Sequence, residues 1–530
     1  MTVHADIDTA RARMTTGRDI PWLLRQWAER TPDKTFLVWE PFTGAGRTWS
    51  YGELARDVEA FAGALHSLGV RLGERVMLHL DNGPEFVIAW FACARLGAVA
   101  VSTNTRSVAR DMAYFAEHAG VVAAVTSPGF AALVADNAPG LRALIVTDDD
   151  AGEPPAAPVT LPHLRFSALL GAGHAAPARA ADPMANLGIQ YTSGTTSRPK
   201  AVLWTHANGL WGAQMNALHM RLRDDDVTLA FLPLFHTNAQ AYSMLGSMWV
   251  GATMVVQPRF SASRFWEVSL RHRCTWCSMI PFCVKAIVEV PKPAKPHHYR
   301  FWGPAVSLPE VQEAFGIATF GWWGMTETIT HGITGDPCVQ DPRMGIGRPS
   351  PGYDIAIRRP DGTPAQPGER GALFIRGVRG VSLFKEYFNN AEANAKAFDA
   401  DGWFATGDMI RIDEAGNLFF SDRDKDMLKV GGENVAASEV EAVILETGWV
   451  RECAVVAQKH HMLDEVPAAF VRAAEGAPID LPERLLEVCR AKLADFKVPR
   501  HIELVDDFPR STLEKIAKNV LRERLPAITK

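Results

Sequence analysis

A turn rich in hydroxyl side chains and glycine lies at residues 190–202, which read QYTSGTTSRPKAV. It follows an apolar segment and precedes a helical stretch that begins near His206. Gly194 permits a close backbone approach and Lys200 brings a positive charge, so the turn is suited to hold phosphate oxygens. It is not a Walker loop, in which serine or threonine directly follows Gly-Lys. Taken alone, the turn also fits a solvated loop. The candidate phosphate ligands are Thr192, Ser193, Gly194, Thr195, Thr196 and Lys200.

A second candidate is Asp408, which ends the segment DGWFATGD at residues 401–408. The glycine before it predicts a sharp turn, and a carboxylate placed there accepts both hydroxyl protons of a ribose. Without further context, an aspartate beside a glycine also fits a turn or cap residue.

The segments around these candidates predict alternating strands and helices. Ser50 and Glu53 form a capping box, and apolar residues then recur at helical spacing. Several short apolar runs follow, separated by a helical segment, which is typical of a parallel sheet covered by helices. The predicted elements are a helix ending near Gly69, strands at 75–80, 98–102, 121–126 and 141–147, and a helix at 84–96 stopped by Gly97.

A domain boundary is expected at the charged turn of residues 423–426, because about a hundred residues follow it. These residues predict strands at 453–458 and 468–471 and a helix at 481–493. The stretches 148–162 and 171–183 read as surface connections within the first part. The fold class is α/β, with a large N-terminal domain of parallel-rich sheets covered by helices, 1–423, and a small α+β domain, 424–530.

Composition excludes several classes. The net charge is -5 and no basic stripe is visible, so a nucleic-acid partner is not expected. The N-terminal 21 residues lack the apolar core of a signal peptide, and no apolar run is long enough for a membrane span. Seven scattered cysteines fit reduced thiols. We therefore expect a cytoplasmic enzyme.

The segment at 190–202 resembles the phosphate-loop signature of the adenylate-forming superfamily, which includes acyl-CoA synthetases, adenylation domains of peptide synthetases and beetle luciferases. Further similar segments recur in the family's order along nearly the whole chain, from residues 49–54 to residues 508–522. The spellings QYTSGTTSRPK, MTETI, FKEYF and GGENV look most like the carnitine/crotonobetaine-CoA ligase branch. The chain departs from the family at Ser197, Ala201 and Glu514, where relatives have glycine.

The resemblance implies an ATP site. Residues 303–305 and 321–327 are similar to the two stretches that sandwich adenine and the acyl group, and Glu327 to the residue that holds magnesium, a hard cation that needs carboxylate oxygen. Asp408 and Arg423 look like ribose ligands, and Lys515 like the adenylation lysine. Besides the phosphate ligands, the implied ATP-binding residues are Gly303, Pro304, Ala305, Trp322, Trp323, Gly324, Met325, Thr326, Asp408, Arg423 and Lys515. The implied catalytic residues are Lys515, Thr195 and Glu327.

The resemblance also implies sites for the acid and for coenzyme A. Lys425 matches the family's hinge, about which the small domain is expected to swing. The implied acyl-binding residues are His236, Asn238, Met279, Gly303, Trp322, Thr328 and His331. The implied coenzyme A residues are Lys429, Gly431, Gly432 and Glu433.

The implied reaction has two halves. A small or medium carboxylic acid and ATP give acyl-AMP and pyrophosphate, with magnesium and Lys515 near the developing charge; the acyl group then passes to coenzyme A. The family pattern also allows a homodimer. Two alternatives stay open: a free-standing enzyme that adenylates an amino acid or aryl acid for a carrier protein, and an inactive nucleotide-binding scaffold.

Overall fold

The computed structural model describes residues 15–107, 109–192, 199–293, 295–336, 338–339, 341–423, 427–430, 433–461, 463–493, 495–510 and 515–529. The chain divides into two compact units. The first comprises Met1–Thr192, Arg198–Ile355 and Ile375–Phe404, and the second Ser193–Ser197, Ala356–Phe374 and Ala405–Lys530. The predicted boundary at residue 423 stays a prediction.

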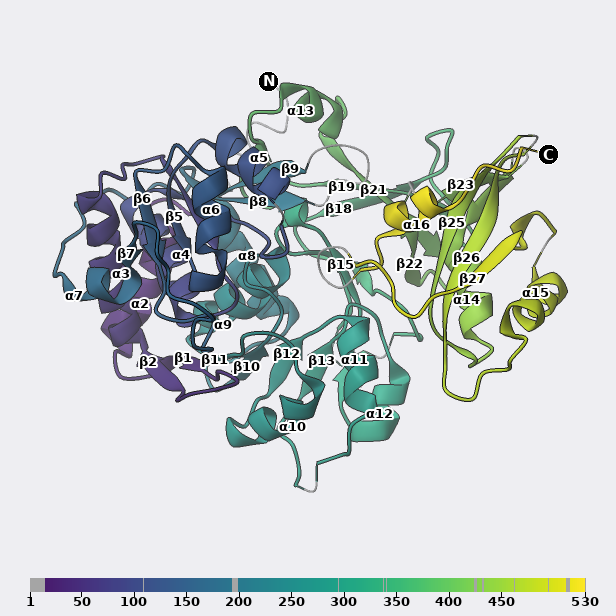
Figure 1. The fold of residues 1–530 in the computed structure, drawn as a ribbon, viewed down its shortest axis with the longest axis horizontal. Coiled ribbons are helices and arrows are strands. Elements are labelled where there is room, and N and C mark those ends of the chain that lie inside the picture. Colours follow the sequence, from purple (N-terminus) through teal and green to yellow (C-terminus); the bar gives the residue numbers. More distant parts are fainter. Residues whose placement is uncertain are drawn as a thin grey trace. The chain divides into compact units, whose positions relative to one another are not determined.

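The first unit is built around two large, mostly parallel sheets (Figure 1). In the eight-stranded sheet, all neighbouring strands are parallel except the two pairs formed by the first three strands in the order given below. In the seven-stranded sheet, only the last two strands in the order given below are antiparallel to each other. The eight-stranded sheet has the order β20 (Glu386–Tyr387), β9 (Lys200–Thr205), β8 (Asn186–Thr192), β4 (Val99–Ser102), β3 (Arg75–His79), β5 (Val121–Thr126), β6 (Ala143–Val146) and β7 (Leu164–Arg165). The seven-stranded sheet has the order β14 (Ala318–Thr319), β13 (Phe301–Gly303), β12 (Trp276–Ser278), β10 (Val227–Ala230), β11 (Thr253–Val256), β1 (Thr35–Trp39) and β2 (Arg47–Ser50).

Local sequence signals set the helices between these sheets. Helix α3 (Tyr51–Ser67) begins at the predicted capping box, in which Ser50 accepts from the Glu53 amide and Glu53 accepts from the Ser50 amide. Helix α4 (Pro84–Leu96) starts with proline at its first position and ends at Gly97, whose φ of 80° is left-handed. Because α3 contacts β1, β2 and α4, and α4 contacts β3 and β4, this pair lies between the two sheets.

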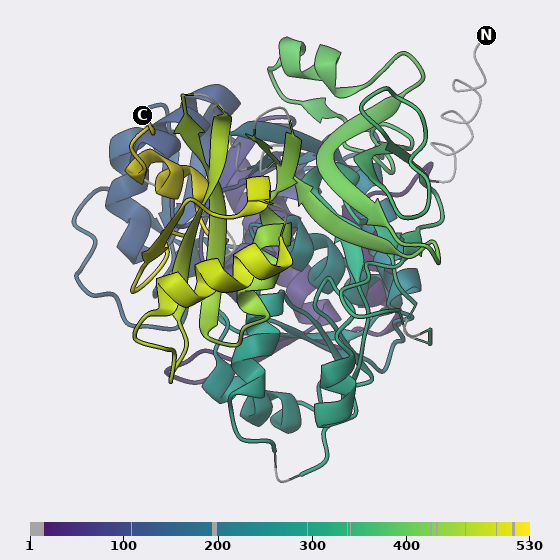
Figure 2. The ribbon, with the colours of Figure 1, turned by 90° about the vertical axis from the view of Figure 1, so that its right-hand side faces the viewer.

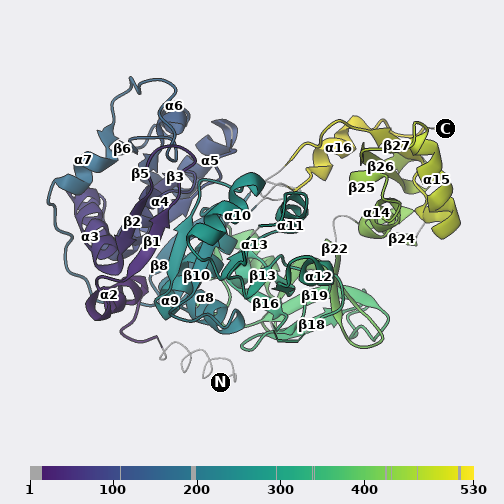
Figure 3. The same cartoon turned by 90° about the horizontal axis from the view of Figure 1, so that it is seen from below.

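Further helices cover the sheets. Helices α5 (Ala109–Ala119) and α6 (Ala131–Asn137) pack on β5 and share a core with Met77, Val99 and Val101. In Figure 1, helices α10 (Ala262–Arg271) and α12 (Pro309–Phe315) lie below β12 and β13, and α11 (Pro281–Val288) lies beside β13; all three face the viewer in Figure 3. The remaining helices are α2 (Ile20–Arg30), α7 (Phe166–Gly171), α8 (His206–His219), α9 (Gly246–Val250) and α13 (Ala391–Ala397), with the short turns η1 (Pro128–Phe130) and η3 (Thr326–Thr328) and the π-helix η2 (Asn238–Leu245).

Two smaller sheets follow. One has the order β15 (Trp322–Gly324), β16 (His331–Thr334) and β17 (Arg348–Pro349), and the other β18 (Asp354–Arg358), β19 (Arg370–Arg376), β21 (Trp403–Ile412) and β22 (Leu418–Arg423). The chain passes from one unit to the other within β18, β19 and β21.

The second unit ends in an α+β fold, which faces the viewer in Figure 2. Its sheet has the order β24 (Glu433–Ala436), β23 (Met427–Val430), β26 (Asp464–Ala473) and β25 (Val450–His460), with β27 (His501–Leu504) parallel to β26. Side chains of β25 alternate between two cores: Cys453 and Val455 pack with α14 (Ala437–Leu445) and α15 (Leu481–Lys492), and Ala454 and Val456 with α16 (Lys518–Arg524). A short turn, η5 (Asp495–Lys497), precedes β27.

Among the described residues, no helix is both long and apolar enough to cross a membrane. None of the seven cysteines, all of which lie in the described part of the chain, forms a disulfide, and six of them are buried.

Candidate active site

The ends of the predicted phosphate loop lie on neighbouring strands of the first unit. Thr192 ends β8 and Lys200 begins β9, and the two are register partners. The Thr192 hydroxyl donates a hydrogen bond of 3.3 Å to the Lys200 carbonyl. This hairpin fixes where the loop leaves and re-enters the sheet. The predicted ligands Ser193, Gly194, Thr195 and Thr196, together with Ser197, lie outside the described residues.

Lys200 and Glu327 both contact the side chain of Tyr387. The Lys200 ammonium is 4.7 Å from the centroid of the Tyr387 ring, and the Tyr387 hydroxyl donates a hydrogen bond of 2.9 Å to Glu327 Oε1. Glu327 is 3% exposed. Tyr387 belongs to β20, which pairs with β9, so sheet register brings its ring to Lys200. Tyr387 thus contacts both the cation that is predicted to bind phosphate and the carboxylate that is predicted to bind magnesium.

The turn that carries Glu327 is held from both sides. The Trp204 indole donates to the Thr326 carbonyl at 2.9 Å, and the Phe384 amide donates to the Glu327 carbonyl at 2.8 Å. Within the turn, the Thr328 hydroxyl accepts from the Met325 amide at 3.0 Å. The Thr328 side chain, predicted to bind the acyl group, is therefore engaged in capping its own turn. Anchored backbone on both sides keeps the carboxylate in one place.

Aromatic rings gather over Gly303, one of the residues predicted to bind the acyl group. A Cβ added at Gly303 would lie 2.0 Å from two carbons of the Trp322 ring, so the ring rests directly on the Gly303 backbone. Trp322 stacks on His331 with centroids 4.6 Å apart, and Tyr242 lies 4.1 Å from the same imidazole. Tyr242, in η2, had no signal of its own in the sequence. All three rings are buried.

His331 is a neutral imidazole in this group. Burial, and to a lesser extent the neighbouring His219, holds the pKa of His331 well below its usual value of 6.5. Burial also lowers the pKa of His219 to about 4. Neither ring nitrogen of His331 has a hydrogen-bond partner among the described residues. At neutral pH, this group of rings therefore carries no charge on Trp322, Tyr242 or His331.

Trp323 points away from this group. Successive side chains of a strand face opposite sides, and Trp323 follows Trp322 in β15. Its ring packs on Gly332, where an added Cβ would lie 2.9 Å from a ring carbon. Trp322 and Trp323, which were both predicted to bind ATP, thus lie on opposite faces of β15.

Backbone contacts join the remaining predicted residues around Gly303. The Met279 amide donates to the Gly303 carbonyl at 2.9 Å, and the Trp322 amide to the Ala305 carbonyl at 3.0 Å. Ala305 has a φ of 67°, a left-handed conformation in which Pro304 and Ala305 turn the chain away from β13. A Cβ added at Gly324 would lie 2.7 Å from the Tyr242 hydroxyl oxygen.

Asn238 and His236 flank a buried polar chain that sequence reasoning missed. Asn238 Oδ1 accepts from the Ser278 hydroxyl at 2.6 Å, and the His236 ring lies 4.6 Å from that of Phe235. Beside them, Thr237 donates to Gln190 Oε1 at 2.6 Å, Gln190 donates to Gln240 Oε1 at 2.9 Å, and Gln240 donates to Ser102 at 3.0 Å. In the sequence, the one indication of this polar chain was Gln190, the first residue of the phosphate-loop segment.

The second unit holds the other predicted residues. Asp408 is 4% exposed and pairs in register with Arg423 across β21 and β22. Gly407 has a φ of 75°, so the expected glycine turn is a local distortion inside β21. Lys515 is exposed and precedes α16, so it does not lie on the terminal helix. Lys425, Gly431, Gly432 and Glu514, and the side chains of Arg423, Lys429 and Glu433, lie outside the described part.

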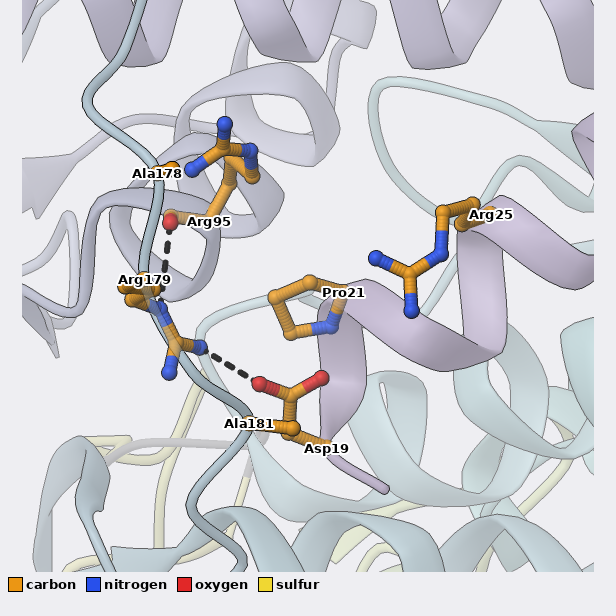
Figure 4. Close-up of a pocket in the computed structure, with 7 residues that line it drawn as sticks. All are labelled: Asp19, Pro21, Arg25, Arg95, Ala178, Arg179 and Ala181. Atoms are coloured by element: carbon orange, nitrogen blue, oxygen red, sulfur yellow. Dashed lines mark hydrogen bonds and ion pairs between the residues drawn. The ribbon is translucent and has the colours of Figure 1, made fainter. Parts of the chain in front are cut away.

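A separate pocket of about 260 Å³ contains none of the predicted residues. In it, Arg179 donates to the Asp19 carboxylate at 2.8 Å and to the Arg95 carbonyl at 3.2 Å (Figure 4). These bonds fasten the connection at residues 171–183 to α2 and α4, which is a structural role. The pocket is lined by Asp19, Pro21, Arg25, Arg95, Ala178, Arg179 and Ala181.

Comparison with known proteins gives the family. The family model for AMP-binding enzymes matches residues 24–388, and that for the C-terminal domain of AMP-binding enzymes matches residues 439–515. A crotonobetaine/carnitine-CoA ligase of Escherichia coli O139:H28 is 35% identical over 509 residues, covering 92% of this chain and 96% of that relative.

Solved structures agree. An anthranilate CoA ligase in complex with anthranoyl-AMP superposes with a TM-score of 0.84 at 26% identity, covering 95% of this chain and 96% of that one. A benzoate CoA ligase from Burkholderia xenovorans LB400 gives a TM-score of 0.82 at 28% identity, with coverage of 95% and 99%. The chain therefore belongs to the AMP-binding enzyme family and, within it, to the acyl-CoA ligases.

Proposed function

We propose that this acyl-CoA ligase joins a small or medium carboxylic acid to coenzyme A in two steps. The acid and ATP give acyl-AMP and pyrophosphate, and thiol attack on the acyl-AMP then gives acyl-CoA and AMP. One observation carries the proposal: the cation of Lys200 and the buried carboxylate of Glu327 both contact Tyr387, beside the ends of the phosphate loop. A positive charge and a carboxylate are the two groups that a metal-bound triphosphate requires.

Glu327 suits a magnesium ion. Mg²⁺ is held in phosphate sites by one or two carboxylates together with phosphate oxygens, and Glu327 supplies carboxylate oxygen from an anchored turn. When bound, the ion would neutralise charge on the phosphates. Lys200 and Thr192, with the loop between them, would hold the same phosphates.

In the second unit, Asp408 with Arg423 would bind the ribose, since a buried carboxylate accepts two hydroxyl protons. Lys515 would approach the α-phosphate as the acid attacks, and its positive charge would stabilise the transition state. We further propose that Lys425 is the hinge by which Lys515 is withdrawn, so that Lys429, Gly431, Gly432 and Glu433 meet coenzyme A.

The acyl group would lie against Trp322, Tyr242 and His331. These uncharged rings favour the non-ionic part of an acid, and the aromatic faces also accept a quaternary ammonium. Because relatives are named for crotonobetaine and carnitine, a trimethylammonium acid is the first substrate to test.

The test is to incubate the enzyme with ATP, magnesium and a panel of acids, with and without coenzyme A, while AMP and pyrophosphate are measured. The panel should pair crotonobetaine with crotonate, which lacks the cation, and add anthranilate, benzoate and amino acids. Thioester that depends on coenzyme A is the expected product. Pyrophosphate exchange driven by an amino acid or aryl acid, with no thioester, would instead support delivery to a carrier protein. ATP binding without turnover of any acid would support a scaffold.

We also propose that the enzyme is cytoplasmic, because the cytoplasm keeps cysteines such as these seven reduced. Homodimer formation is a further proposal, which sedimentation in solution tests.

A further inference from the structure

Tyr387 is held rigidly by its own neighbours. Its backbone amide donates to Asn394 Oδ1 at 2.8 Å, and Asn394 Nδ2 donates back to the Tyr387 carbonyl at 2.8 Å. Its ring lies 4.7 Å from that of Phe384, centroid to centroid, and the residue is 3% exposed. The ring and hydroxyl are therefore held in one position by the strand and by these contacts.

The two ends of this side chain meet opposite charges. Its ring is 4.7 Å from the Lys200 ammonium, and its hydroxyl is 2.9 Å from Glu327 Oε1. A lysine ammonium and a glutamate carboxylate in direct contact form an ion pair, whose attraction is strong where water is excluded. Such an ion pair would occupy both groups. The contacts with Tyr387 instead give each charge a weaker partner, which a ligand can replace or supplement.

We propose that Tyr387 is a positioning residue for the magnesium and triphosphate site. Its hydroxyl orients Glu327 for the metal, and its ring keeps Lys200 from pairing with Glu327. This inference rests on the proposed function, in which Glu327 binds magnesium and Lys200 binds phosphate. It goes beyond that function by assigning a role to Tyr387, a residue that the sequence did not mark as part of the site.

The experiment compares Tyr387→Phe, Tyr387→Leu and Glu327→Gln with the unmodified enzyme. ATP binding is measured by calorimetry at increasing Mg²⁺, and Mn²⁺ binding in the presence of ATP by electron paramagnetic resonance, both without acid. Tyr387→Phe is expected to raise the half-saturating Mg²⁺ about tenfold, because removing the partner of a metal ligand costs 10–100-fold in metal affinity. Saturating Mg²⁺ should restore ATP binding in this variant.

Tyr387→Leu removes the ring as well, so Lys200 can pair with Glu327. We expect ATP affinity to stay low in this variant even at saturating Mg²⁺. Tyr353→Phe is the matched control, because the buried Tyr353 hydroxyl donates to the Thr328 carbonyl at 2.7 Å and not to Glu327. Its Mg²⁺ dependence should be that of the unmodified enzyme, and thermal unfolding verifies that all variants fold.

The outcomes separate the inference from the proposed function. Half-saturating Mg²⁺ that is unchanged in Tyr387→Phe but raised in Glu327→Gln would overturn the inference alone. Unchanged Mg²⁺ binding in Glu327→Gln would overturn the magnesium assignment, and the inference with it. Combining Tyr387→Phe with Glu327→Gln should add no further loss, whereas an added loss would show that the tyrosine acts by another route.

Discussion

The side-chain amide of Gln190 donates a hydrogen bond of 2.9 Å to the side-chain oxygen of Gln240, 50 residues further along the chain. Both residues are buried. The bond ties β8, which leads into the phosphate loop, to the π-helix η2, which carries Asn238 and Tyr242. π-Helical turns are rare in proteins, and those that occur often lie at functional sites. The Gln190–Gln240 hydrogen bond holds this one in place relative to β8.

Replacing Gln240 with leucine should destabilise the protein. The change leaves the Gln190 amide and the Ser102 hydroxyl without this partner, at a cost of about 1–3 kcal/mol for a buried group, measured by urea denaturation. Gln257→Leu is the control, because the buried Gln257 side-chain amide nitrogen has no hydrogen-bond partner among the described residues. Adding Gln190→Leu to Gln240→Leu should cost less than the sum, and strict additivity would argue against the cross-link.

Gly303→Ala should damage the acyl site. The added methyl group would lie 2.0 Å from the Trp322 ring, so either the ring or β13 must move. Overpacking of this kind costs about 1–3 kcal/mol in unfolding free energy. A displaced Trp322 should also raise KM for the acid more than KM for ATP. Gly140→Ala, where an added Cβ meets nothing within 4 Å, is the matched control. Equal KM values in both variants would contradict this account.

Lys515→Ala should separate the two half-reactions. If Lys515 acts on ATP alone, adenylate formation should fall by orders of magnitude, whereas thioester formation from supplied acyl-AMP and coenzyme A should be largely retained. Lys518→Ala is the neighbouring control, since the Lys518 ammonium pairs with Glu441 at 2.9 Å. A Lys515 variant equally impaired in both assays would refute the assignment.

The buried histidines should make stability depend on pH. His331 has a folded-state pKa well below 6.5, so the unfolded chain binds the additional proton and stability is lost as pH falls below about 6.5. One such group accounts for about 1 kcal/mol between pH 7.5 and 5.5. His331→Phe keeps a ring beside Trp322 and Tyr242 but cannot bind a proton. Its stability should therefore fall by about 1 kcal/mol less over that range, as urea denaturation at several pH values measures. Identical pH profiles would contradict the prediction.

Elements with strong local signals were predicted from the sequence with little error. Helix α4 runs from Pro84 to Leu96 as expected, and β5 spans residues 121–126, because proline, glycine and apolar runs act within a few residues. Predicted strand 141–147 is shorter, at Ala143–Val146, since ends are set by pairing with β5.

The contacts that organise the site could not be predicted in this way. Gln190 meets Gln240, and Tyr387 meets Glu327 60 residues away, only because the sheet and the π-helix bring them together. Periodicity carries no information on such pairs. The letters FKEYF pointed to a subgroup, but only the register of β20 with β9 places Tyr387 beside Lys200.

Ile329 follows the Glu327 turn with a φ of 61°, which is unusual for a β-branched residue and costs on the order of 1–3 kcal/mol. Glycine would relieve this strain, yet the buried Ile329 side chain fills the space over Gly212, where an added Cβ would lie 2.8 Å from Ile329 Cγ2. The left-handed backbone at Ile329 and the absence of a side chain at Gly212 therefore depend on each other. Replacing either residue alone should lower the free energy of unfolding. A tolerated substitution would therefore have to change Gly212 and Ile329 together.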